Sequence, residues 1–557
     1  MAAWLLCLGL VAAFSPTDLH YFAALPTAEL TAATADFNTT ELVSLGESLL
    51  FNTSAYPQAF TLLNRSAALG ESAAFYPLGF MYLYRLVELA EDRPVVSTAL
   101  TYYYFAALDG DVRALLALAY RHLKGVDMPN ECEAACAYYE VVARRVVQEQ
   151  VEGRFVLLTE QKRLIHPWGG DYTSTDEEEM LIEEFTIQHY AEEIPGKLAK
   201  AYRYYYGHRG YPQDLTQAAE LYQEAAALGS HQAKAALGEM YLIGRGIAQN
   251  LTLALDLFTE AAAFGVAKAK TGLGYMYLTG LGVNIEHSKG TDYMKQAALA
   301  GDPNAVFNLG VMYLLGELEG PTNARKAFQS FNSAMHYGHT MAGYHLALMH
   351  KHELDMFTSC TSGANLFKMI AERGVHSSTL KVAHELFAAG DMRGAAIRYL
   401  QAADQGYEVA QVNAAYLFET ESLIPHSLDV ARRMLELAAE QKDVGSVLRL
   451  GDYYYYGLGV PMDLTLAFAY YTRGRELRSP QAMFNLGYMY HYGEGVDKDP
   501  HLAKRYYDQA VSESQTFNAP ANLMLFLLLH EVEWADLLLY VEMSVVLLAS
   551  LCALKLI

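Results

Sequence analysis

The sequence has few cysteines, and their number is too small for a disulfide framework. Of the five in 557 residues, Cys7 and Cys552 fall in apolar segments at the two ends. Three cysteines in a body of this size cannot hold the fold together, so we expect stability to come from helix packing. Cys132 and Cys136 are four residues apart in a helical run, where a bridge between them would be strained. We predict two small buried residues there, with a zinc or redox role as the alternative.

Positive charge is scarce as well. The chain has 40 Lys and Arg residues against 63 Asp and Glu residues, a formal net charge of −23. A nucleic acid would have to bind against the mean field of this protein, and no basic run interleaved with aromatics offers a local site. We therefore expect no nucleic-acid partner.

Motifs that carry catalysis are missing from the sequence. It has no Gly-x-Ser-x-Gly elbow and no phosphate-binding Walker motif. His345, His350 and His352 lie near Glu353 without the HExxH spacing, so we interpret them as a solvated helix end and not as a metal site. We predict that the chain is not an enzyme and that it has no catalytic residue, no cofactor and no metal; an unrecognised active site is the alternative.

Apolar segments at both ends predict a membrane protein with its body on the lumenal side. Trp4–Phe14 has the length of a signal peptide, and small residues favour cleavage after Ala13, although the lack of Lys or Arg before it leaves a buried helix as the alternative. Residues 537–557 would span about 31 Å as a helix and carry only Glu542 and Lys555 as charges, which predicts one transmembrane helix. A glycolipid-anchor signal is the alternative for this segment.

Four glycosylation sequons agree with a lumenal body. Three of them cluster in the first 66 residues, as expected for an exposed entry segment. The four acceptor asparagines are Asn38, Asn52, Asn64 and Asn250.

An internal repeat of 36 residues is the strongest signal in the sequence. It is carried by Ala225-Ala226, Ala261-Ala262 and Ala297-Ala298, and in phase by Leu237-Gly238, Leu273-Gly274 and Leu309-Gly310. Each unit predicts two antiparallel helices, here 218–228 and 233–243, separated by a glycine. Such units stack into a superhelix, so the fold class is all-α: an α/α solenoid followed by the transmembrane helix.

The repeat pattern resembles the Sel-one-like repeat, a relative of the tetratricopeptide repeat. Two longer stretches, 405–415 and 479–490 with its continuation to Asp508, are similar to the endoplasmic reticulum lumenal adaptors (SEL-one-L/HRD-three type) of HRD-type ubiquitin ligases. The resemblance covers nearly all of 64–508. It implies a non-catalytic adaptor in ER-associated degradation that sits in the endoplasmic reticulum membrane as a single-pass type I protein.

The same resemblance implies partners and a binding surface. The partners are a membrane RING ubiquitin ligase of the HRD type, misfolded lumenal glycoproteins and ER lectins, while self-association is left open. The apolar run Leu523–Leu529 is a further candidate for contact with the membrane or the ligase. The residues expected to face the ligase are Met483, Phe484, Tyr488, Tyr490, Leu502, Arg505 and Tyr506.

An alternative function uses the same repeats. The chain would then be a surface or secreted scaffold, lipid-anchored, that regulates other membrane proteins. The domain organisation we predict is signal peptide 1–13, glycosylatable segment 14–63, N-terminal repeats 64–141, acidic irregular insertion 142–198, middle repeats 199–420, C-terminal repeats 421–516, juxtamembrane segment 517–536 and transmembrane helix 537–557.

Overall fold

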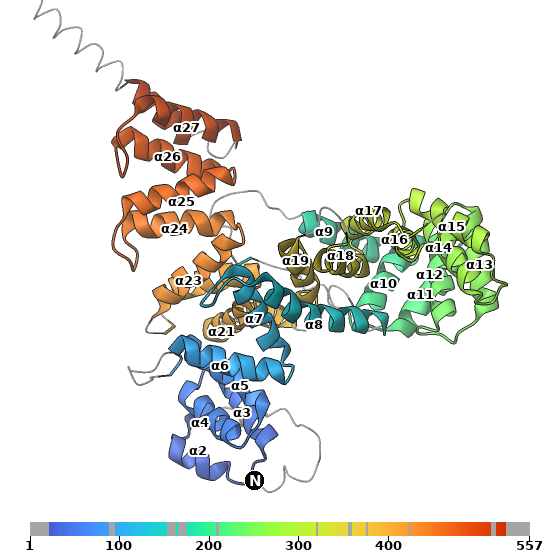
Figure 1. Ribbon diagram of the computed structural model, residues 1–557, viewed down its shortest axis with the longest axis horizontal. Helices are drawn as coiled ribbons and strands as arrows, with labels where there is room; N and C mark the ends of the chain where they lie inside the picture. The colour runs from blue at the N-terminus through green and yellow to red at the C-terminus, as the bar shows by residue number, and fades with distance from the viewer. Residues whose placement is uncertain are drawn as a thin grey trace, which may run out of the picture. The chain divides into compact units, whose positions relative to one another are not determined.

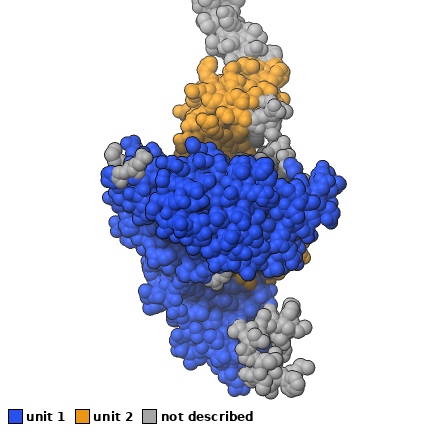
Figure 2. Space-filling view, turned by 90° about the vertical axis from the view of Figure 1, so that its right-hand side faces the viewer, with its two compact units in different colours: residues 1–160, 172–382 blue, residues 161–171, 383–557 orange. Residues whose placement is uncertain are grey.

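The computed structural model describes an all-helical chain that divides into two compact units (Figures 1 and 2). Unit 1 comprises residues 1–160 and 172–382, and unit 2 comprises residues 161–171 and 383–557. The described residues are 22–87, 95–152, 163–164, 175–207, 211–318, 321–354, 359–374, 377–421, 423–424, 426–513 and 520–530. Within these ranges every regular element is an α-helix or a short 3-10 helix, which confirms the all-α repeat fold.

Unit 1 holds the N-terminal repeats and the middle repeats as far as residue 382. Its helices are α2 (Thr27–Ala33), α3 (Thr39–Asn52), α4 (Tyr56–Ala68), the 3-10 helix η2 (Ser72–Ala74), α5 (Phe75–Leu83), α6 (Val95–Leu108), α7 (Val112–Lys124), α8 (Cys132–Val151), α9 (Thr175–His189), α10 (Ile194–Tyr206), α11 (Leu215–Ala227), α12 (His231–Ile243), α13 (Leu251–Ala263), α14 (Ala267–Thr279), α15 (His287–Leu299), α16 (Pro303–Leu315), α17 (Ala324–His336), α18 (Thr340–Lys351) and α19 (Cys360–Ala371).

Unit 2 holds the end of the middle repeats, from residue 383, and the C-terminal repeats. α20 (Ser378–Ala388) runs across the division of the chain, and a further helix covers residues 520–530. The helices that follow α20 are α21 (Met392–Asp404), α22 (Glu408–Thr420), α23 (Ser427–Glu440), α24 (Val444–Tyr456), α25 (Leu464–Glu476), α26 (Pro480–Tyr492) and α27 (Pro500–Glu513).

Small residues and glycine caps explain how one repeat is built. In α12 the Ser230 hydroxyl accepts a hydrogen bond from the Ala233 N–H at 3.2 Å, and Gly244 ends the helix with φ of 79°, a left-handed conformation that favours glycine. A Cβ on Gly238 would lie 2.7 Å from the Phe258 ring, so the glycine lets the next helix approach closely. The predicted helices 218–228 and 233–243 correspond to α11 and α12.

α8 packs against helices from two distant parts of unit 1. It packs against α7, which precedes it, and also against α18 and α19, which follow it by about 200 residues (Figure 1). The Glu140 carboxylate pairs with Lys351 of α18, and Arg144 Nε lies 3.4 Å from the Tyr344 hydroxyl. The stretch 142–198 also differs from the expectation, because it contains the second half of α8, all of α9 and the first turn of α10. The acidic run starts in α9 and is helical, not irregular.

A disulfide between α8 and α19 corrects the expectation for the cysteines. Cys132 is bonded to Cys360, although helix packing alone was expected to hold the body. Cys136 is a buried free thiol, as predicted. The sequence could not indicate the bridge because its two cysteines are 228 residues apart.

Of the three histidines predicted to form a solvated helix end, His352 is exposed at the end of α18 beside the exposed Glu353, whereas His345 and His350 are packed. The His345 ring stacks on Phe331 at 5.4 Å between centroids, and His350 is buried. At the start of the helix, His339 Nδ1 accepts a hydrogen bond from the Ala342 N–H at 3.1 Å, so this nitrogen carries no proton. Burial lowers the pKa of His339 to about 4.

In unit 2, Arg163 lies between two carboxylates. Its guanidinium is 2.5 Å from Asp443 Oδ1 and 2.7 Å from Glu408 Oε1, and the Leu164 N–H donates to Asn413 Oδ1 at 3.0 Å. Burial raises the pKa of Glu408 to about 7, against the opposing charge of Arg163. Burial also favours the neutral form of Asp443, but Arg163 and the Ser446 hydrogen bonds outweigh it and lower the pKa of Asp443.

The predicted ends of the chain lie outside the described residues. This applies to the signal peptide 1–13 and to the transmembrane helix 537–557. Among the helices of the described ranges, none combines the length and apolar character needed to cross a bilayer.

Candidate partner-binding surface

The C-terminal repeats are built around the close approach of α26 and α27. A Cβ on Gly487 would lie 2.7 Å from two ring carbons of Tyr507, which is fully buried. The ring is held from its other sides by Phe484, whose centroid is 5.7 Å away, and by His491 Nδ1, which is 3.4 Å from the Tyr507 hydroxyl. The lack of a side chain at Gly487 therefore lets the Tyr507 ring pack directly on the backbone of α26.

Four of the seven residues expected to face a ligase are engaged in packing within this stack. Met483 is buried together with Ala510 and Ala521, and Phe484 packs on Tyr507. Tyr490 stacks on Tyr506 with centroids 5.6 Å apart.

Of the other three residues, only Arg505 is exposed. Tyr488 is half-buried and packs on Tyr492, and Leu502 is half-buried. Burial and then the nearby Glu494 carboxylate raise the pKa of Tyr488, so its hydroxyl is a neutral donor at pH 7. Tyr488, Leu502 and Arg505 remain candidates for direct contact.

Two exposed tyrosines were missed by the sequence reasoning. Tyr456 and Tyr492 are 66% and 44% exposed, and each is the last residue of its helix before a left-handed glycine. They occupy the same position in successive repeats, 36 residues apart. A periodic signal could have found them, because the residue directly before the capping glycine is large and exposed in other repeats too. Ile243 and Leu315 hold this position in unit 1 and are exposed.

The helix of residues 520–530 lies on the end of this stack and presents apolar side chains on both faces. Ala521 and Leu528 are buried against residues of α26 and α27. The opposite face exposes Leu523, Phe526 and Leu527 by 58%, 63% and 40%. A cluster of large exposed apolar side chains is typical of a surface that contacts a protein or a membrane. This cluster, Leu523, Phe526 and Leu527, is called the apolar face below.

All four sequons are sterically available. Asn38, Asn52, Asn64 and Asn250 are exposed. Asn38 and Asn250 also begin helices: their side-chain oxygens accept hydrogen bonds from the N–H groups of Glu41 and Leu253. This contact uses the amide oxygen and leaves the amide nitrogen, the atom that glycosylation modifies, on the surface.

A known family model matches the repeats. The Sel1 repeat model matches residues 112–144, 197–230, 231–263, 267–302, 303–332, 409–443, 446–478 and 480–514. The chain carries eight Sel1 repeats. They fall in both units and include the whole of α26 and α27.

Curated relatives match over short stretches. Protein sel-1 homolog 2 of Mus musculus is 33% identical over 135 residues, which cover 23% of this chain and 19% of the relative. The ERAD-associated E3 ubiquitin-protein ligase component HRD3B of Arabidopsis thaliana is 30% identical over 167 residues, 28% of each chain. The match thus spans less than a third of each relative. Among solved structures, the antigen c5321 of uropathogenic Escherichia coli is similar over 90% of this chain and 93% of its own, with 19% identity and a TM-score of 0.23.

Proposed function

We propose that this chain is a non-catalytic adaptor in ER-associated degradation. In this role its repeats recruit misfolded lumenal glycoproteins and ER lectins, and its C-terminal repeats hold a membrane RING ubiquitin ligase of the HRD type. The similarity to HRD3B, itself described as a ligase component, supports the proposal. The Sel1 repeats supply an extended surface for protein partners, which suits a scaffold.

The observation that carries the proposal is the apolar face at the end of unit 2. Its side chains are exposed, so burying them against a ligase or a bilayer would release about 25 cal/mol for each Å² removed from water. The described residues of this helix, 520–530, lie a few positions before the segment proposed to cross the membrane, 537–557. An adaptor anchored there would bring the C-terminal repeats close to the lumenal side of a membrane ligase.

Purification of the full chain from mild detergent tests the proposal. The variant Phe526→Gln/Leu527→Gln removes apolar contacts without touching the buried Ala521 and Leu528, so the fold is expected to persist. Leu299→Gln, at a residue 90% exposed in unit 1, is the matched control. We expect a multi-span RING ligase to co-purify with the wild type and the control, and to be reduced at least tenfold with the double variant.

The outcomes separate the function from the site. Wild-type protein that co-purifies with no RING ligase would contradict the adaptor function. Full retention of the ligase by the double variant would contradict the assignment of the apolar face. Release of the wild-type chain from membranes by a phospholipase, with fully processed glycans, would instead favour the lipid-anchored surface scaffold.

A further inference from the structure

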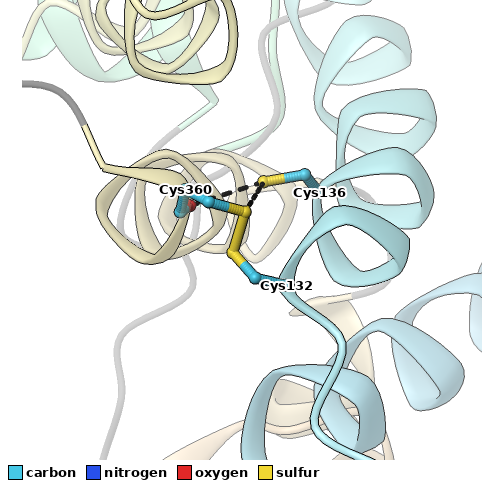
Figure 3. A group of neighbouring side chains, drawn as sticks. All are labelled: Cys132, Cys136 and Cys360. Carbon is cyan, nitrogen blue, oxygen red and sulfur yellow. Dashed lines mark hydrogen bonds between the residues drawn. A yellow bond between two sulfur atoms is a disulfide. The ribbon is translucent and has the colours of Figure 1, made fainter.

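Three sulfur atoms meet where α8 packs on α19. Cys132 and Cys136 lie one turn apart on the same face of α8, and Cys360 begins α19 (Figure 3). Cys136 Sγ is 3.8 Å from Cys360 Sγ and 3.5 Å from the Cys360 carbonyl oxygen. All three sulfurs lie within 4.8 Å of one another. The bond between Cys132 and Cys360 uses two of them, and the third, on Cys136, is a buried free thiol.

The arrangement is a triangle and not a line. For thiol–disulfide exchange, the attacking sulfur approaches along the disulfide axis. An attack of Cys136 on Cys360 from 3.8 Å would then place the Cys132 and Cys136 sulfurs about 6 Å apart, since a disulfide is about 2 Å long. The limit of 4.8 Å excludes that alignment. Cys136 is therefore badly placed to attack the bridge.

The triangle fits a metal ion well. Zinc–thiolate bonds of about 2.3 Å place the sulfurs of a tetrahedral or trigonal site about 3.8–4.0 Å apart. The separation of Cys136 and Cys360 already has this value, and once the bridge is reduced the Cys132 and Cys360 sulfurs need to move apart by about 2 Å. Zinc sites often take two of their ligands from positions i and i+4 of one helix.

We propose that the reduced form of this cluster binds one Zn²⁺ ion through Cys132, Cys136 and Cys360. A thiol reductant delivers two electrons and two protons to the Cys132–Cys360 bond and leaves as its own disulfide. Zinc then displaces the three thiol protons, and a water completes its coordination. The ion takes over from the disulfide as the cross-link between α8 and α19. This proposal does not rest on the adaptor function.

The surroundings agree with such an exchange of cross-links. Cys132 and Cys360 are half-buried, which gives a reductant and an ion access, whereas Cys136 is 1% exposed. Burial raises the pKa of the Cys136 thiol, Lys351 opposes this, and Glu140 and Glu133 add to it. A cation bound at the sulfur would supply the charge that the thiolate otherwise lacks.

Zinc uptake by the full-length protein tests the site. The wild type and Cys136→Ala are reduced with a phosphine, freed of metal, incubated with Zn²⁺ and washed, and zinc is counted by elemental mass spectrometry. We expect the reduced wild type to retain one more zinc per chain than reduced Cys136→Ala, and the oxidised wild type to lose this difference. Cys7 and Cys552 are present in both proteins, so their contribution cancels.

Two further measurements keep the outcome decisive. Peptide mapping of oxidised Cys136→Ala should still find the Cys132–Cys360 bridge, which shows that the variant folds. Cobalt added to the reduced wild type should give a thiolate-to-metal absorption band that Cys136→Ala lacks. Equal zinc retention by the two reduced proteins would overturn the proposal. So would a Cys136–Cys360 bridge formed without metal uptake, which would assign Cys136 to disulfide exchange.

Discussion

Replacing Gly487 by alanine should loosen the C-terminal repeats, although alanine is the better helix former. The added Cβ would sit 2.7 Å from Cδ1 and Cε1 of Tyr507, closer than van der Waals contact allows. The Tyr507 ring cannot move away, because it is fully buried and is flanked by Phe484, His491 and Leu528. The strain must therefore be taken up by separation of α26 from α27.

The magnitude follows from two opposing terms. Overpacking of a filled core costs about 1–3 kcal/mol, and replacing glycine by alanine within a helix returns about 1 kcal/mol. We expect a net loss of about 1 kcal/mol, which corresponds to roughly fivefold faster opening. In a repeat protein the effect should stay near the altered repeat, because each repeat contacts only its neighbours.

Hydrogen exchange measured by mass spectrometry gives this local readout. Amides of α26 and α27 should exchange roughly fivefold faster in Gly487→Ala, while those of unit 1 stay unchanged. Gly445→Ala is the matched control, since a Cβ there meets only an Asp443 oxygen at 3.4 Å, and it should exchange as slowly as the wild type or more slowly. Unchanged or slower exchange in Gly487→Ala would refute the reasoning that glycine is required as a seat for the ring.

Three further outcomes are expected. Arg163→Ala should lower the free energy of unfolding by about 2 kcal/mol at pH 8, where Glu408 and Asp443 face each other ionised. The loss should be smaller at pH 5, because the raised pKa of Glu408 keeps this carboxyl protonated. Urea unfolding at both pH values checks this, and an equal loss at both would contradict it. The wild type should lose about 1–2 kcal/mol between pH 7 and pH 5 through His339, because its folded pKa lies below its unfolded one and the unfolded chain gains the proton first. His339→Asn keeps a capping residue and should lessen this loss in thermal unfolding scans, so an unchanged pH dependence would exclude His339 as its source. Endoglycosidase should remove glycans from Asn38, Asn52, Asn64 and Asn250 and so increase the electrophoretic mobility of the chain. Each Asn→Gln change should remove one glycan and one step of this increase. A chain made in a secretory host whose mobility does not change on treatment would argue against a lumenal body.

The repeated helices were predictable because their chemistry recurs along the chain. Gly238 and Gly487 are required where an aromatic ring of the next helix packs on the backbone, so they appear in register with the repeat. The helix ends were found for the same reason, since a left-handed glycine such as Gly244 closes the second helix of many repeats. Local rules of this kind leave a periodic trace in the sequence.

The candidate binding surface was harder to predict. Met483 and Phe484 belong to a stretch that resembles a family motif, but motif residues in a repeat are mostly those that stack the helices, and both lie in the packing. Tyr492 is 44% exposed, and the same position holds different side chains in other repeats, Ile243 and Leu315 among them, so it lacks a fixed residue type. The bridge from Cys132 and the contacts of Arg163 join segments more than 200 residues apart, so no local pattern reports them.

The double packing of α8 has a consequence for synthesis on the ribosome. α8 ends at Val151, while its second neighbour, α19, begins at Cys360. At a translation rate of about 5–20 residues per second, one side of α8 stays uncovered for roughly 10–40 s until α19 is made. During that interval the nascent chain exposes a surface that the finished protein hides, including Cys136 and the Glu140 carboxylate that pairs with Lys351. A chaperone that binds early in translation would therefore find its target on α8, well before the repeats that eventually cover it have been made.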